Sequence, residues 1–174
     1  MNHTLHQLQH EIASALDGLD ATQTQLRPAA PNKWTIQQII EHLLLTYSGA
    51  EMALNARLAK GRPTIAKPTA FQRIQQIAVC DFGYFPHGRT APPMVTPEPT
   101  AHPLSGDELT AATEDHLDRL DVLCNETERL FADHRFASHN VLGPLSVQQW
   151  RRFQLIHGRH HLKQIAAIRK AHNL

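Results

Sequence analysis

Two histidines near the end of the chain, His157 and His161, are four positions apart. In a helix, side chains with this spacing lie one turn apart on the same face. Two imidazoles arranged in this way can bind one transition-metal ion, and neutral imidazole is a good ligand for zinc, nickel, copper or iron. The pair is therefore the first candidate for a metal site.

The side chains around this pair indicate that it faces the interior. With about 100° of rotation per residue, the face that carries both histidines also carries Trp150, Phe153, Gln164 and Ile168. The basic residues are expected on the other side: Arg151, Arg152, Arg159, Lys163 and Lys170. Each buried ring has two nitrogens that need partners, and a metal would satisfy one nitrogen of both rings. Two core histidines satisfied by ordinary hydrogen bonds are the alternative, and these residues alone leave both open.

His42 is the best candidate for a third ligand, because two histidines rarely complete a site. It lies two turns into a predicted helix, at the edge of the apolar stripe. Its helical neighbours are small or polar and suit the wall of a cavity: Gln38, Thr46 and Gly49. A boundary histidine half exposed to water is the alternative. Glu41 should point away from His42 by about 100°, so it is not nominated.

The chain has 13 histidines, and their positions matter more than their number. His6 and His10 also show a spacing of four, but they project away from the apolar stripe of their helix and are expected to be solvated. His160 lies just off the inward face; it could replace His161 or hydrogen-bond to a neighbouring group, and the second role is favoured. A surface or boundary position is expected by default for six others: His87, His102, His116, His134, His139 and His172.

Four long helices are predicted to position these residues, each opened by a capping box in which Ser or Thr is followed three residues later by Gln or Glu. The four boxes are Thr4 with Gln7, Thr35 with Gln38, Ser105 with Glu108, and Ser146 with Gln149. Pro28 should stop the first helix, and the second should end before Gly61. Apolar residues spaced by threes and fours predict an all-α four-helix bundle, and strand signals are nearly absent.

A long proline-rich connection, residues 61–103, separates the second predicted helix from the third. Residues 69–80 are expected to form a short helix with Phe71, Ile74 and Ile77 facing inward. Connections of this length in compact domains are usually functional or disordered. The aromatic residues that follow favour a packed cover over a mobile linker.

The composition fits a single domain spanning residues 1–174. The net charge of +1 and the mixed charge pattern give no electrostatic footprint of nucleic-acid or membrane binding. Cys80 and Cys124 have neither metal-type spacing nor a disulfide framework, so they are expected to be reduced thiols in a cytoplasmic protein. Glu41 and His42 interrupt the longest apolar stretch, so no membrane span is expected.

The order of these motifs resembles the DinB superfamily of four-helix-bundle metalloproteins. Trp34 and Thr35 precede a helix with a single histidine, and the last helix has the pattern His-x-x-x-His-x-x-Gln, ending at Gln164. More narrowly, residues 85–89 and 139–145, Trp150 and residues 160–164 resemble a branch of unassigned function. Many relatives carry Arg-Gly between the last histidine and the glutamine, whereas this chain has Leu162 and Lys163. This difference bears on substrate specificity more than on metal binding.

The resemblance implies that His42, His157 and His161 bind one divalent metal, zinc or nickel, with water or substrate in the remaining positions. Three neutral ligands leave the ion its full charge and an open position, which suits Lewis-acid chemistry. The resemblance further implies a transferase in which the metal ionises a low-molecular-weight thiol, such as bacillithiol, mycothiol or glutathione, for attack on a small electrophile. A homodimer is also expected from the family.

Five further residues are weaker candidates for contacts around the metal or substrate. Gln164 would orient a ligand or the thiol, and His160 would support a ligand. Arg89 or His87 would bind an anionic group from the covering loop, and His139 belongs to a segment that matches the family branch. The alternatives are an ordinary polar contact for Gln164 and a solvated loop charge for Arg89.

Three other functions stay open at this stage. Water in place of a thiol on the metal would make the protein a hydrolase. A metal- or ligand-binding stress protein would show no turnover at all. The simplest alternative is a helical bundle that holds no metal in the cell.

Overall fold

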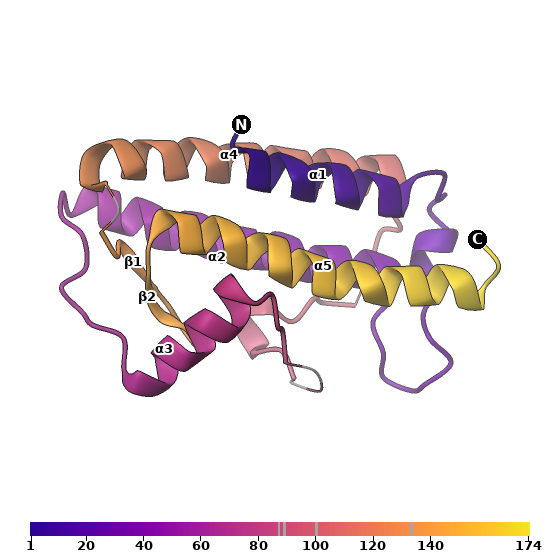
Figure 1. Cartoon of the computed structure of the whole chain (residues 1–174). Coiled ribbons are helices and arrows are strands. Elements are labelled where there is room, and N and C mark those ends of the chain that lie inside the picture. Colours follow the sequence, from indigo (N-terminus) through magenta and orange to yellow (C-terminus); the bar gives the residue numbers. More distant parts are fainter. Residues whose placement is uncertain (87, 89, 100, 133) are drawn as a thin grey trace.

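The computed structural model describes residues 1–174 except residues 87, 89, 100 and 133 (Figure 1). Four long helices dominate the described residues: α1 His3–Leu16, α2 Ile36–Ala59, α4 Gly106–Phe131 and α5 Val147–Ala171. The shorter elements are α3 Ala70–Gln76, η1 Gln23–Gln25, η2 Ile77–Asp81, η3 Pro93–Val95, β1 Ala137–His139 and β2 Gly143–Leu145. The predicted all-α four-helix bundle with a long connection after the second helix is confirmed.

The four long helices surround one apolar core, with α1 and α4 lying over α2 and α5 (Figure 1). Gln37, near the start of α2, accepts a hydrogen bond from the Leu104 amide just before α4, so these two helices run in the same direction. Further along, Glu51 of α2 contacts His116 of α4. In the part of the chain that is described, no helix is long and apolar enough to cross a membrane.

Three of the four predicted capping boxes are present, at Thr35, Ser105 and Ser146. The prediction for the first helix is wrong. Asn2 is its N-cap and accepts from the Thr4 amide at 3.0 Å, which leaves Thr4 inside the helix. A further capping box, formed by Thr69 and Gln72, opens α3.

The first helix is also shorter than predicted, because it ends at Leu16 and not at Pro28. Gly18 adopts a positive φ of 72°, a conformation that favours glycine and ends a helix. Asp20 then accepts the amides of Thr22 and Gln23 at 2.8 Å and fixes the turn that leads into η1. The local turn chemistry therefore overrides the apolar periodicity that continues to Leu26.

The connection contains the predicted short helix, α3, but its orientation is the reverse of the prediction. Phe71, Ile74 and Ile77 are 66%, 64% and 48% exposed. The buried side faces the backbone of a hairpin formed by β1 and β2, which the sequence did not reveal. Gln76 donates to the carbonyls of Leu142 and Pro144 at 2.7 and 3.0 Å. Because carbonyl groups line this contact, a polar donor lies inside.

Arg151 is the clearest exception to the expected outward face of α5, since it is only 1% exposed. Its guanidinium group contacts the Glu128 carboxylate and the Asn125 side-chain oxygen, each at 2.6 Å. Asp121 lies 3.9 Å away. The basic side chain is buried because α4 supplies acidic and amide partners on that side.

Candidate metal centre

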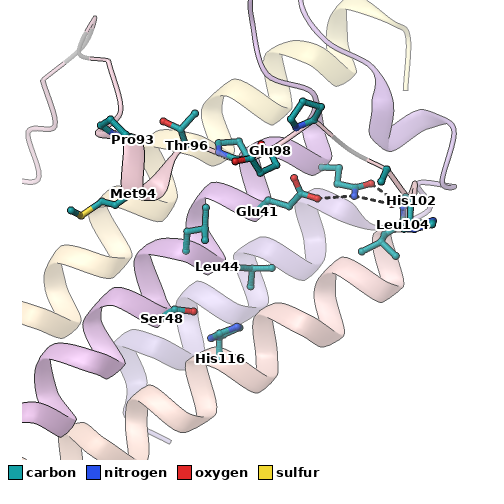
Figure 2. Close-up of a pocket in the computed structure, with 15 residues that line it drawn as sticks. Glu41, Leu44, Ser48, Pro93, Met94, Thr96, Glu98, His102, Leu104 and His116 are labelled. Carbon is teal, nitrogen blue, oxygen red and sulfur yellow. Dashed lines mark hydrogen bonds between the residues drawn. The ribbon is translucent and has the colours of Figure 1, made fainter.

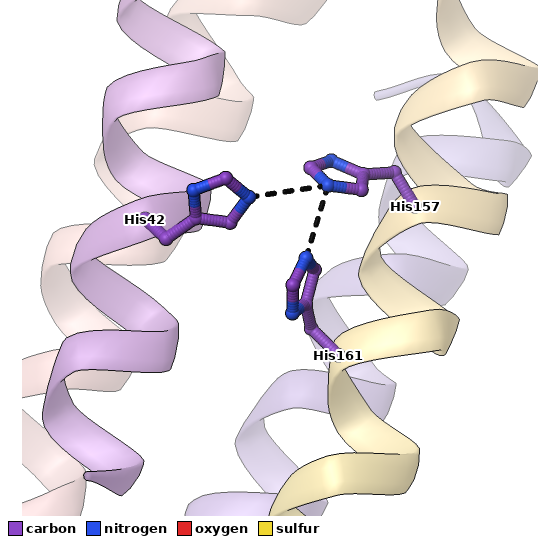
Figure 3. A group of neighbouring side chains, drawn as sticks. All are labelled: His42, His157 and His161. Carbon is purple, nitrogen blue, oxygen red and sulfur yellow. Dashed lines mark hydrogen bonds between the residues drawn. The ribbon is translucent and has the colours of Figure 1, made fainter. Parts of the chain in front are cut away.

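The three histidines nominated from the sequence meet between α2 and α5 (Figure 3). The Nε2 atom of His157 lies 3.3 Å from Nε2 of His42 and 3.0 Å from Nε2 of His161. One ligand atom from each ring lies within 4.8 Å of the other two. The side chains are only 4–6% exposed. The structure thus brings these residues together, and their binding of a metal stays a prediction.

Local packing explains why the rings can converge. The Thr35 capping box fixes the start of α2 and thereby the direction of His42. On α5, a Cβ atom at Gly158 would lie 2.4 Å from a methyl group of Leu8. Glycine at this position therefore allows α1 to approach α5 closely beside His157.

The outer nitrogens of two rings are held by hydrogen bonds. Nδ1 of His42 donates to the carbonyl oxygen of Val95 at 2.6 Å, and Nδ1 of His161 donates to Oε1 of Gln164 at 3.1 Å. These acceptors place the proton of each neutral ring on Nδ1. Both rings consequently present an unprotonated Nε2 atom to the centre of the group.

His157 makes this arrangement difficult to satisfy with protein groups alone. Its Nδ1 atom is buried and has no hydrogen-bond partner among the described residues. If His157 carries its proton on Nε2, this N–H group can donate to one neighbouring ring, and the lone pair of Nδ1 then accepts no hydrogen bond. A proton on Nδ1 would leave three nitrogen lone pairs facing one another. A cation among the three Nε2 atoms would bind all three lone pairs, so the donor set fits a metal.

Burial favours the neutral form of each ring, which is the form that binds metals. It lowers the pKa of His161 to about 3. For His157, burial holds the pKa well below its usual range, and the neighbouring histidines add to the effect. Burial also lowers the pKa of His42, although the hydrogen bond to Val95 opposes the shift.

Aromatic side chains cover the three rings. The Trp34 ring lies 4.9 Å from His42 and 6.4 Å from His161, measured between ring centroids. The Phe85 ring stacks on His157 at 5.0 Å, and Phe153 stacks on it at 5.4 Å. These contacts exclude water and strengthen electrostatic interactions at the centre.

The weaker candidates occupy different surroundings. Gln164 is exposed and links His161 to His160, whose Nε2 accepts from its amide at 3.3 Å. His139 is not one of the three converging rings, and its ring contacts Phe153, which stacks on His157. Its Nδ1 atom accepts the amides of Val141 and Leu142, a role in the hairpin turn. His87 and Arg89 lie outside the described residues.

No side-chain pattern predicts the Val95 contact, because any residue type offers a backbone carbonyl. The aromatic residues of the connection predicted a packed cover, and Phe85 provides it over His157. The pattern did not show which aromatic residue lies inside, because Phe82 and Tyr84 of the same stretch are exposed.

A groove of about 670 Å³ lies between α2 and the segment that contains η3 (Figure 2). Leu44 and Leu45 of α2 form part of its wall, and Met94 and Thr96 form another part. The three histidines do not line it. Val95, whose carbonyl oxygen accepts the hydrogen bond from His42, lies in the chain between two residues that line the groove, Met94 and Thr96.

Comparison with known proteins identifies the family. A sequence model described as the DinB superfamily matches residues 4–165. The chain therefore belongs to the DinB superfamily. Searches of curated proteins and of solved structures found no match.

Proposed function

We propose that this chain binds one divalent cation, zinc or nickel, through His42, His157 and His161, and uses it in a transfer reaction on a small electrophile. The nucleophile would be a low-molecular-weight thiol. The observation that carries the proposal is the convergence of three buried Nε2 atoms, two of them unprotonated because their rings donate through Nδ1. Membership of the DinB superfamily supports the same assignment.

A cation with three neutral ligands keeps its charge and an open position, and would lower the pKa of a thiol or water bound there. Side chains and one backbone carbonyl of the chain orient the three rings and surround this open position. Val95 and Gln164 hold two rings with their lone pairs inward. Trp34, Phe85 and Phe153 keep the surroundings of the three rings apolar. In such surroundings, the attraction between a bound cation and a thiolate would be stronger than in water.

Hydrolysis is the second candidate, and the position of His160 favours it. This ring is half buried, lies 5.1 Å from the ring of His161 and 4.8 Å from that of Phe85, and is not one of the three converging rings. An imidazole so close to the centre could accept a proton from an attacking water. The two candidates differ in whether turnover requires a thiol.

The first experiment measures metal in protein purified without a histidine tag. Wild type should contain close to one equivalent of zinc or nickel, and His157→Ala should contain almost none. His10→Ala is the matched control, because this histidine is exposed and has the same spacing to a second histidine. Equal metal content in wild type and His157→Ala would contradict the proposed site.

The second experiment measures turnover of a model electrophile by the zinc- or nickel-loaded protein, with and without bacillithiol, mycothiol or glutathione. The transferase proposal expects turnover only when thiol is present. Equal turnover without thiol, reduced in His160→Asn, would favour hydrolysis. Bound metal with no turnover under either condition would assign the protein a binding role.

A further inference from the structure

The groove between α2 and the segment that contains η3 has the size of a small-molecule site. Its volume of about 670 Å³ lies within the range of about 300–1,000 Å³ that such sites occupy. Apolar side chains come from both of its walls, Leu44 and Leu45 from α2 and Met94 from η3. Leu45 and Met94 are 37% and 70% exposed. A ligand would therefore find apolar surface to cover on each side.

The charged groups that line the groove are carboxylates, those of Glu41 and Glu98 (Figure 2). No lysine or arginine among the described residues lines it. None of the ion pairs in the described part of the chain includes either carboxylate. Glu41 accepts only a neutral donor, the side-chain amide of Gln37, at 2.8 Å. The groove thus combines apolar walls with negative charge that no basic side chain offsets.

The other end of the groove also offers an acceptor. His116 lines this end, and its Nδ1 atom donates to the Glu51 carboxylate at 2.8 Å (Figure 2). The Nε2 atom of the neutral ring is then an acceptor. Glu51 itself is paired with Arg119, so the excess of negative charge comes from the first two carboxylates. A complementary ligand brings hydrogen-bond donors and a positive charge.

The outer wall of the groove is fixed to α2 before any ligand arrives. The side-chain amide of Gln37 donates to the carbonyl of His102 at 3.1 Å. The amide of Gln38 donates to the carbonyl of Glu98 at 3.4 Å. Because these bonds hold the connection in place, binding costs less conformational entropy than it would in a mobile loop.

Both walls of the groove are connected to His42. Met94 and Thr96 line the groove, and the carbonyl of Val95, between them, accepts from Nδ1 of His42 at 2.6 Å. Backbone hydrogen bonds within this turn make its residues move together. On the opposite wall, Glu41 directly precedes His42 on α2. A ligand that contacts both walls would stabilise the arrangement in which Val95 holds the imidazole.

We propose that the groove binds a small molecule with an ammonium group on an apolar body, and that Glu41 and Glu98 bind the ammonium group. Its occupant would raise the metal affinity of the three-histidine centre, because it stabilises the bond between Val95 and His42. This second part rests on the proposed function. By reciprocity, bound metal would raise the affinity for the ligand by the same factor.

The first test uses 4-phenylbutylamine as the probe. The controls are 4-phenylbutanol and 4-phenylbutanoate, which have a similar shape with no charge and with the opposite charge. In protein labelled with carbon-13 at the methionine methyl groups, NMR should show the Met94 signal move, with a dissociation constant of about 1 mM or less. Met52 is the matched control, because it is 72% exposed and does not line the groove. A Met94 signal that stays, or that moves equally with the alcohol, would overturn the proposal.

Charge removal tests the two carboxylates. Glu41→Gln keeps an oxygen that can accept from Gln37. This variant and Glu98→Gln should each weaken amine binding about threefold, and the double variant about tenfold. Glu126→Gln is the matched control, because Glu126 is exposed on α4 and does not line the groove. Thermal melts establish that each variant is folded. Unchanged amine affinity in the double variant would overturn the proposed ammonium site.

The last test compares metal-free and zinc-loaded protein. Zinc should raise the amine affinity about fivefold, and the amine should raise the zinc affinity equally. The double variant keeps all three histidines and should lose this effect, which excludes direct binding of the amine to zinc. Equal amine affinities in the two forms of wild type, or an effect that persists in the double variant, would overturn the coupling. A wild type that binds no zinc would contradict the proposed function, and the metal-free titration would still decide whether the groove binds the amine.

Discussion

Two pairs of histidines in this protein have the same spacing and opposite surroundings. His6 and His10 on α1 are exposed, whereas His157 and His161 on α5 are 5% and 6% exposed. Among the described residues, only the second pair converges with a third imidazole, that of His42. The spacing of four thus aligns two imidazoles in both helices, but the neighbouring helix decides whether they can share a ligand. The sequence motif therefore determines the alignment of two rings, and the fold determines whether a third ring joins them.

Removal of one ring from each pair should give the largest contrast. His157→Ala should weaken zinc affinity by at least about 100-fold, because it deletes one of the three proposed ligands. His10→Ala should leave the affinity unchanged. Competition with a chromophoric chelator measures both. A comparable loss in the two variants would show that the exposed pair binds the metal.

The effect of burial on a histidine can be tested at His139, which is not one of the candidate ligands. Burial lowers the pKa of His139 to about 4, compared with about 6.5 in an unfolded chain. The unfolded state therefore binds a proton first as the pH falls. The stability that neutral His139 contributes is complete above pH ~6.5 and is lost down to pH ~4, by up to about 3 kcal/mol.

Urea unfolding across this pH range measures the slope. His139→Asn should make the decrease in stability with falling pH less steep, and the exposed His10→Asn should leave it unchanged. Parallel slopes for wild type and His139→Asn would show that His139 is not held neutral in the folded protein.

The support of His161 by Gln164 should have a smaller effect on metal binding. Gln164→Leu removes the acceptor of the Nδ1 proton, and the loss of such a contact typically costs about tenfold or more in metal affinity. Lys163→Leu is the control, because its side chain is also exposed on α5 and belongs to the predicted basic face. An unchanged affinity in Gln164→Leu would show that the ring needs no such support.

The smallest effect, on the free energy of unfolding, is expected at a contact between α1 and α5, the helices that carry the two histidine pairs. Arg159 of α5 contacts Glu11 of α1, with Nε and Oε2 2.8 Å apart. The hydrogen bond from Arg159 lowers the pKa of Glu11, so the stabilisation is present near neutral pH and lost as the carboxylate becomes protonated. Because both side chains are partly exposed, Glu11→Gln should cost less than about 1 kcal/mol in urea unfolding. A cost of several kcal/mol would contradict this assignment as a surface pair.

The fold was largely predictable because long helices reveal their inner face through many repeated positions. The capping boxes at Thr35, Ser105 and Ser146 fixed three helix starts. Short segments gave less information. In α3 the periodicity separated two faces correctly but did not show which one meets the protein, because the hairpin that covers Gln76 has strands of only three residues.

The three converging histidines were also predictable, since each lies on a long helix with a defined inner face. Their supports were predictable only in part. Gln164 shares the face of His161, three positions further along the same helix. The Val95 carbonyl reaches His42 through an irregular path that no side-chain pattern encodes. Arg151 was wrongly predicted to face outward, because the residues that bind its guanidinium group are on another helix.

The bond between His42 and Val95 has a consequence for variation among sequences. Because the acceptor belongs to the main chain, no exchange of the side chain at position 95 deletes it. Insertions or deletions between Pro92 and Pro97 would displace the carbonyl and free the imidazole to rotate. Related chains that conserve this centre should therefore tolerate many residue types in this stretch while preserving its length.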